Sequence, residues 1–168
     1  TFQNLQIFFN MSALENVMVG RHLRERAGWL AAMLRSRRLT AGERESREEA
    51  AELMRFVGLG EYVGAEADAM PYGALKRLEI ARALATEPKL LALDEPAAGM
   101  TDEETARLAA LLKGIAGERS VVVVEHDMEF VRALDATVTV LHEGSVLAEG
   151  TLDRVQANER VIEVYLGR

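Results

Sequence analysis

Apolar residues are spaced as in helices through most of the first half of the chain. They recur three and four positions apart over 12–35, 43–57 and 74–86, which predicts three helices. The polar stretch 36–42 contains a glycine and is predicted to be a loop between the first two. Ser12 and Glu15 have capping-box spacing at the start of the first helix. This half is therefore expected to be mostly helical.

The second half contains two short continuous apolar runs, of which the later one is β-branched. Leu90–Leu93 and Val121–Val124 are predicted strands, and the second is typical of a parallel strand covered on both faces. A helix over 102–116 lies between them, with Thr101 and Glu104 as its capping box. A strand, a helix and a further strand in this order predict a right-handed crossover unit.

The remaining residues predict a helix, a hairpin and a helical tail. Residues 127–134 are expected to be helical, 137–141 and 145–148 to form a hairpin around Glu143-Gly144, and 151–166 to form two short helices. The fold class is therefore α/β, with a helical subdomain that is inserted in, or attached to, a parallel-sheet core. We expect one part over 1–88 and a second over 89–168.

Composition narrows the class of protein. The 168 residues are 49% hydrophobic and 28% charged, which is an ordinary globular balance. No apolar run approaches the roughly 20 residues that span a bilayer. The net charge of −7 and the lack of a basic footprint argue against nucleic-acid binding. Cysteine is absent, which excludes disulfides and thiolate metal sites.

Two local features bear on partners and processing. Arg35, Arg37 and Arg38 follow an apolar stretch, and they form either a solvated basic helix end or a docking surface for a membrane-embedded partner. The chain begins with Thr1 and shows neither the basic region nor the cleavage site of a signal peptide. Because the first residue is not Met, Thr1 is expected not to be the natural start.

Two adjacent carboxylates end the first predicted strand. Ligands of open parallel sheets bind beyond the carboxyl ends of the strands. Asp94 is therefore a candidate ligand for Mg²⁺, which prefers oxygen donors, and Glu95 a candidate for orienting or deprotonating a water. The alternative is a solvated turn.

The second strand ends in the same way, in Glu125-His126. If the two strand ends are neighbours, His126 reaches the same ligand as Glu95, and an imidazole can donate a hydrogen bond to a phosphate oxygen. A satisfied surface histidine is the alternative. The occurrence of both strand ends together favours a shared site.

Two weaker candidates lie earlier in the chain. Gly73 precedes a predicted helix, where backbone N–H groups can approach an anion. The cations of that helix either serve an anion or keep the helix soluble; they are Lys76, Arg77 and Arg82. Gln3 offers an amide that can coordinate Mg²⁺ or hold a water.

Taken in order, these residues resemble the ATP-binding-cassette (ABC) ATPases. Phe2-Gln3-Asn4 is similar to the glutamine loop, and Tyr72-Gly73 with the helix after it to the family signature. Leu90–Pro96 resembles the magnesium-binding strand with its catalytic glutamate. Ala97–Met100 resembles the loop that contacts the second subunit, and His126 the switch histidine.

The resemblance implies an incomplete P-loop NTPase-like core with a helical subdomain. It implies ATP and Mg²⁺ as ligands, with Gln3 and Asp94 serving Mg²⁺ and Tyr72, Gly73 and Gln3 contacting the nucleotide. Glu95 would act on the attacking water and His126 on the γ-phosphate. ATP hydrolysis would be coupled to transport.

The resemblance also implies partners and a location. These are a second cassette subunit, identical or different, and membrane permease subunits, at the cytoplasmic inner face of the cell membrane. The resemblance is closer to the branched-chain amino-acid importers and their urea and amide relatives, on Tyr72-Gly73, Ala97–Met100 and Val161–Gly167.

The sequence departs from the family pattern in three places. No G-x-x-x-x-G-K-[ST] occurs in the 168 residues, so the phosphate loop is expected upstream and the isolated chain is expected to bind ATP weakly and to have no significant activity. Pro71 stands where a serine is usual, and Ala74 and Thr101 replace polar residues. The alternatives are a non-catalytic interaction module that docks to a permease or partner cassette, and a cassette ATPase not linked to transport.

Overall fold

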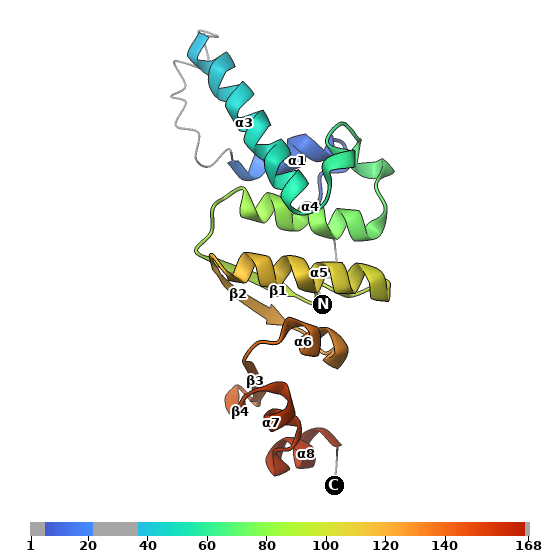
Figure 1. The fold of residues 1–168 in the computed structure, drawn as a ribbon, viewed down its shortest axis with the longest axis vertical. Coiled ribbons are helices and arrows are strands. Elements are labelled where there is room, and N and C mark those ends of the chain that lie inside the picture. Colours follow the sequence, from blue (N-terminus) through green and yellow to red (C-terminus); the bar gives the residue numbers. More distant parts are fainter. Residues whose placement is uncertain (1–5, 22–36, 167–168) are drawn as a thin grey trace. The chain divides into compact units, whose positions relative to one another are not determined.

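The computed structural model describes residues 6–21 and 37–166, with side-chain positions for 6–21 and 42–165 (Figure 1). It forms two compact units. The first comprises Thr1–Leu93 with Ile115–Val122, and the second Asp94–Gly114 with Val123–Arg168. Among the described residues, no helix has both the length and the apolar character needed to cross a membrane.

Helices make up most of the first unit. These are α1 (Ala13–Arg21), α3 (Arg37–Phe56) and α4 (Tyr72–Leu84), with 3₁₀ turns at Gly60–Tyr62 and Ala67–Ala69. α1 packs against both α3 and α4, as Figure 1 shows. The fully buried side chains of this unit's core include Val17, Met54 and Leu78 of the three helices and Leu59 of the segment after α3. Within α3, Ala50 and Met54 are buried, and so is Val57, which follows the end of the helix.

Two local interactions fix the start of α1 and its approach to α4. Ser12 and Glu15 form the predicted capping box, since the Ser12 N–H donates to Glu15 Oε2 at 2.9 Å and the Glu15 N–H donates to Ser12 Oγ at 3.2 Å. A Cβ at Gly20 would lie 2.3 Å from the carbonyl oxygen of Arg82. The two helix backbones therefore meet at a position that only glycine fits.

Two helix boundaries differ from the prediction. The expected loop at 36–42 is wrong from residue 37 onward, because α3 already begins at Arg37 and includes Gly42. One exposed glycine costs a helix about 1 kcal/mol, and strong helix formers such as Arg, Ala and Glu surround this one. α4 begins at Tyr72, so Gly73 lies inside its first turn rather than before it. The predicted helical residues 22–35 lie outside the described residues.

The predicted strand–helix–strand unit is present. β1 (Leu90–Asp94) pairs with β2 (Ser120–Val124), and α5 (Asp102–Ala116) connects them. The Ser120 N–H donates to Lys89 O at 3.2 Å and the Glu95 N–H to Val124 O at 2.9 Å. The first bond joins the starts of the two strands and the second joins their carboxyl ends, so the strands are parallel. The Thr101–Glu104 capping box of α5 is also confirmed.

The prediction that β2 is covered on both faces is wrong for the described residues. Its exposure alternates along the strand, and the side chains of Val122 and Val124 are 51% and 60% exposed. Leu90 of β1 is 54% exposed. Within the described chain the sheet has two strands only, and one of its faces stays uncovered.

The second unit continues with short elements. α6 (Met128–Leu134) follows β2, and β3 (Val138–His142) pairs antiparallel with β4 (Ser145–Gly150), as predicted. α7 (Leu152–Gln156) and α8 (Glu159–Leu166) are the two predicted tail helices. Arg132 of α6 bonds Asp153 and Gln156 of α7, and the Tyr165 hydroxyl of α8 donates to Leu141 O at 2.8 Å. These bonds hold the tail helices to the rest of the unit.

Candidate active site

Glu95 takes an unusual backbone conformation immediately after β1. Its φ is +44°, in the left-handed region, which costs a non-glycine residue roughly 1–2 kcal/mol. The bond from its N–H to Val124 O ties this turn to the end of β2. Strain of this kind persists where the surrounding structure imposes it, and such positions cluster at functional sites.

The carboxylate of Glu95 faces the imidazole of His126. Glu95 Oε1 lies 3.3 Å from His126 Nδ1, with side-chain exposures of 35% and 77%. The predicted proximity of the two strand ends is thereby confirmed. When Nδ1 carries the proton it donates to Glu95, which leaves Nε2 to face solvent or a ligand. The pair can thus present a carboxylate and a ring nitrogen to one small molecule.

Glu125 is the buried member of this group. Its side chain is 2% exposed. One carboxylate oxygen accepts the Ala97 N–H at 3.1 Å, and the other accepts the N–H groups of His126 and Asp127 at 3.1 and 3.4 Å. In the sequence, Glu125 stands out only as a polar residue at a strand end. Its position directly before His126 was the available signal.

Asp127 shapes the next turn. Its side chain accepts the N–H groups of Glu129 and Phe130 and caps α6, and Phe130 is 1% exposed. The loop that carries His126 is therefore held by Glu125 on one side and by a capped, anchored helix on the other. The capping role of Asp127 was not predicted from the sequence.

The two candidate magnesium ligands are Asp94 and Gln3. Asp94 is exposed at the end of β1, while Gln3 lies outside the described residues. Among the described residues, no group of three or more His, Cys, Asp or Glu side chains could hold a metal ion. Mg²⁺ at phosphate sites commonly takes one or two carboxylates plus phosphate oxygens and waters. A single exposed carboxylate such as Asp94 fits that mode.

Tyr72 and Gly73 occupy the first turn of α4, in the first unit. The Pro71 carbonyl accepts the N–H groups of Ala74 and Leu75, both at 3.0 Å. The N–H groups of Tyr72 and Gly73 lie in the first turn, where a helix offers its N–H groups no carbonyl acceptor of its own. Tyr72 is 41% exposed, and Gly73 is buried.

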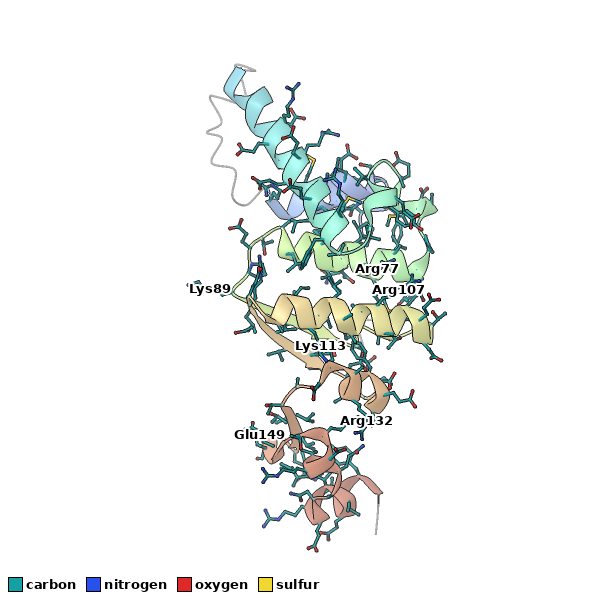
Figure 2. The ribbon with its side chains drawn as sticks, in the orientation of Figure 1. Arg77, Lys89, Arg107, Lys113, Arg132 and Glu149 are labelled. Atoms are coloured by element: carbon teal, nitrogen blue, oxygen red, sulfur yellow. The ribbon has the colours of Figure 1, made fainter. Side chains whose placement is uncertain are left out.

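The cations of α4 are mostly engaged within the protein. Arg77, labelled in Figure 2, donates to the carbonyl oxygens of Gly58 and Gly73 at 3.1 and 3.4 Å. The Arg82 guanidinium lies 5.5 Å from the ring centroid of Phe8, and the Lys76 ammonium 5.8 Å from that of Tyr72. Arg77 therefore has a structural role.

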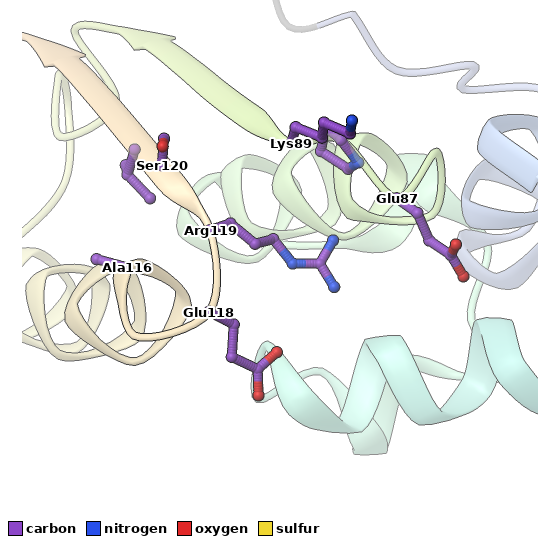
Figure 3. Close-up of a pocket in the computed structure, with 8 residues that line it drawn as sticks. Glu87, Lys89, Ala116, Glu118, Arg119 and Ser120 are labelled. Carbon is purple, nitrogen blue, oxygen red and sulfur yellow. The ribbon is translucent and has the colours of Figure 1, made fainter.

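A pocket of about 850 Å³ lies at the other ends of β1 and β2. Its lining includes Lys89, which precedes β1, Ser120, which begins β2, and Arg119, whose side chain extends into the hollow in Figure 3. Ligands of parallel sheets bind at the carboxyl ends of strands. This pocket is at the amino ends, and we assign it no ligand.

Comparison with protein-family models gives two matches. The ABC transporter model matches residues 1–98, which is more than half of the chain. A model described as branched-chain amino acid ATP-binding cassette transporter matches residues 145–168. This chain belongs to the ABC transporter family.

Curated members of the ABC transporter family align over almost the whole chain. The high-affinity branched-chain amino acid transport ATP-binding protein BraF of Pseudomonas aeruginosa is 39% identical over 99% of this chain, and LivG of Escherichia coli is 34% identical over the same share. The methionine import ATP-binding protein MetN of Leifsonia xyli is 36% identical over 94%. The chain spans 66% of the length of BraF and LivG and 42% of that of MetN.

Solved structures of ABC transporter cassettes confirm the fold class. A nucleotide-free ATP-binding cassette superposes with a TM-score of 0.77 at 26% identity, covering 100% of this chain and 68% of that one. A cassette in its ADP conformation superposes with a TM-score of 0.72 at 25% identity, covering 100% and 66%. The α/β core of this chain is therefore that of the P-loop cassette ATPases.

Proposed function

We propose that this sequence serves as the ATP-binding and ATP-hydrolysing subunit of an ABC importer for branched-chain amino acids or a related amide or urea solute. Membership of the family supports the activity. The names of BraF and LivG and the match at residues 145–168 support the solute class. The observation that carries the proposal is the 3.3 Å approach of Glu95 to His126 at the carboxyl ends of two parallel strands.

Glu95 and His126 carry the chemistry in this proposal. The Glu95 carboxylate orients the attacking water and accepts its proton, and His126 Nδ1 fixes that carboxylate. His126 Nε2 then faces the γ-phosphate. With Nδ1 bonded to Glu95, the imidazolium form donates to phosphate through Nε2. Phosphoryl transfer depends almost wholly on such positioning and on charge stabilisation.

The remaining candidates bind the substrate. Asp94 and Gln3 would hold Mg²⁺, which neutralises charge on the phosphates. Gln3 also contacts the nucleotide in this proposal. Tyr72 and Gly73 would present the N–H groups of the α4 N-terminus to an ATP bound by the second cassette subunit.

The proposal includes an assembly. A second cassette subunit, identical or different, and membrane permease subunits are the partners, at the inner face of the cell membrane. Residues 1–88 would carry the glutamine loop, the permease-contacting helices and the signature helix. Residues 89–168 would carry the carboxyl-terminal part of the ATPase core.

The test compares Glu95→Gln with Glu129→Gln in the full gene product that contains these residues. Glu129 is an exposed carboxylate in the first turn of α6. We expect the Glu95 variant to bind MgATP as the parent does and to lose about 100-fold or more in turnover, the size of a lost general base. The Glu129 variant should match the parent.

A parent protein that hydrolyses no ATP, alone or with its permease, would contradict the proposal. That result would favour a non-catalytic module that docks to a permease or partner cassette. The absence of a G-x-x-x-x-G-K-[ST] sequence within these 168 residues is the observation that supports this second function.

A further inference from the structure

Glu125 is a buried carboxylate that the proposed chemistry does not use. It is 2% exposed, whereas its neighbour His126 is 77% exposed. Charged side chains are rarely buried unless they are paired or fully hydrogen-bonded. The contacts of Glu125 therefore indicate what it does.

Its two oxygens bind two different loops. Oε1 accepts the N–H of Ala97, two residues after Glu95, at 3.1 Å. Oε2 accepts the N–H groups of His126 and Asp127, at 3.1 and 3.4 Å. The carboxylate thus joins the loop after β1 to the loop after β2.

The two loops that this link joins carry Glu95 and His126. Ala97 is buried, and the Glu95 backbone is bonded to Val124, the last residue of β2. The backbone around Glu95 is therefore held at two points, by the bond from the Glu95 N–H to Val124 O and by the bond from the Ala97 N–H to Glu125. His126 has its own N–H fixed by Glu125. The 3.3 Å separation between Glu95 and His126 depends on both loops keeping their places.

We propose that Glu125 is a positioning residue, whose buried carboxylate clamps the 95–98 loop to the backbone at His126 and so holds Glu95 and His126 at their working distance. The consequence for turnover rests on the proposed function. The clamp itself rests only on the contacts above.

Glutamine distinguishes a clamp from simple packing. It has nearly the size and shape of glutamate, but its amide has one acceptor oxygen and one NH₂ donor. Whichever way the amide turns, its NH₂ meets an N–H donor. Glu125→Gln can therefore keep the hydrogen bond from the Ala97 N–H or those from the N–H groups of residues 126 and 127, but not both sets. Aspartate retains both acceptors on a side chain shorter by one methylene.

The structural test measures amide hydrogen exchange in the full gene product. We expect Glu125→Gln to speed exchange about tenfold or more at Ala97 or at His126 and Asp127, as follows from losing a charge-assisted bond. Glu125→Asp should show a smaller increase, and Glu129→Gln none. Unchanged exchange in Glu125→Gln would overturn the clamp. Should Glu125→Gln not fold, parent-like exchange in Glu125→Asp would overturn it too.

The kinetic test separates positioning from binding. Small displacements of reacting groups cost up to about 100-fold in rate. Glu125→Gln should lower kcat for ATP by about 10- to 100-fold with KM within about twofold, and Glu125→Asp should recover part of the loss. A parent-like kcat alongside an inactive Glu95→Gln would refute this inference alone. A parent-like Glu95→Gln would refute the proposed function and leave the exchange result to decide the clamp.

Discussion

Removing the Asn16 side chain should destabilise the first unit by about 2 kcal/mol. Asn16 is 0% exposed. Its Oδ1 accepts the Phe8 N–H at 2.9 Å, and its Nδ2 donates to the carbonyl oxygens of Phe8 and Ser12 at 2.9 and 3.0 Å. This side chain attaches the segment before α1 to the helix.

The magnitude follows from what each partner retains in Asn16→Ala. A protein hydrogen bond contributes a net 0.5–1.5 kcal/mol, roughly, and a buried donor left unpaired costs about 1–3 kcal/mol. The two carbonyls keep other partners, since Phe8 O also accepts the Met11 N–H and Ser12 O the Asn16 N–H. The Phe8 N–H has no such substitute, and its part-burial lets water recover some of the loss.

Urea denaturation followed by far-ultraviolet circular dichroism measures the effect. Asn10→Ala is the matched control, because Asn10 is exposed. It should change the free energy of unfolding by about 0.5 kcal/mol or less, as for most surface substitutions. A loss below about 0.5 kcal/mol for Asn16→Ala would refute the reasoning from buried hydrogen bonds.

Three further predictions follow from local geometry and sequence. Gly20→Ala should destabilise the first unit by about 1–3 kcal/mol, because the added Cβ clashes with Arg82 O. Gly114→Ala is the control: it has open space around it and should stabilise α5 by about 0.5–1 kcal/mol. Equal changes in the free energy of unfolding for the two variants would contradict the close approach at Gly20. Bonds from Ser12 lower the pKa of Glu15, so their contribution is complete above the ordinary glutamate range and is lost as pH falls below it. The protection factors of the α1 amides, which are corrected for the intrinsic exchange rate at each pH, should therefore fall on acidification less in Glu15→Gln than in the parent. An identical response would contradict this. Calorimetric titration of the 168-residue chain with MgATP should show affinity weaker than micromolar, because these residues hold no G-x-x-x-x-G-K-[ST] cradle, and micromolar binding would contradict it.

Spacing rules predicted the features that depend on neighbours in sequence. Both capping boxes, at Ser12–Glu15 and Thr101–Glu104, are present as hydrogen bonds. The order of strands, helices and hairpin also agrees with the structure. The proximity of Glu95 to His126 followed from one further rule, that the carboxyl ends of parallel strands meet at one edge.

Features that depend on tertiary contacts were not predictable in this way. A carboxylate after a strand, such as Glu125, is usually solvated, and its burial arises only when two loops close over it. Asn16 is ordinary in a helix sequence until the preceding segment folds back onto it. Gly42 indicated a loop, but the neighbouring residues carry the helix through it. The exposure of Val122 and Val124 depends on what covers the sheet, which their own composition does not specify.

The most direct test of the account is a double-mutant cycle on Glu95 and His126, measured as single-turnover ATP hydrolysis in the full gene product. Residues that act as one catalytic unit have strongly non-additive effects. We predict that Glu95→Gln combined with His126→Ala is within about threefold of the slower single variant. Rate losses that multiply would show that the two side chains act independently, and would contradict the shared site.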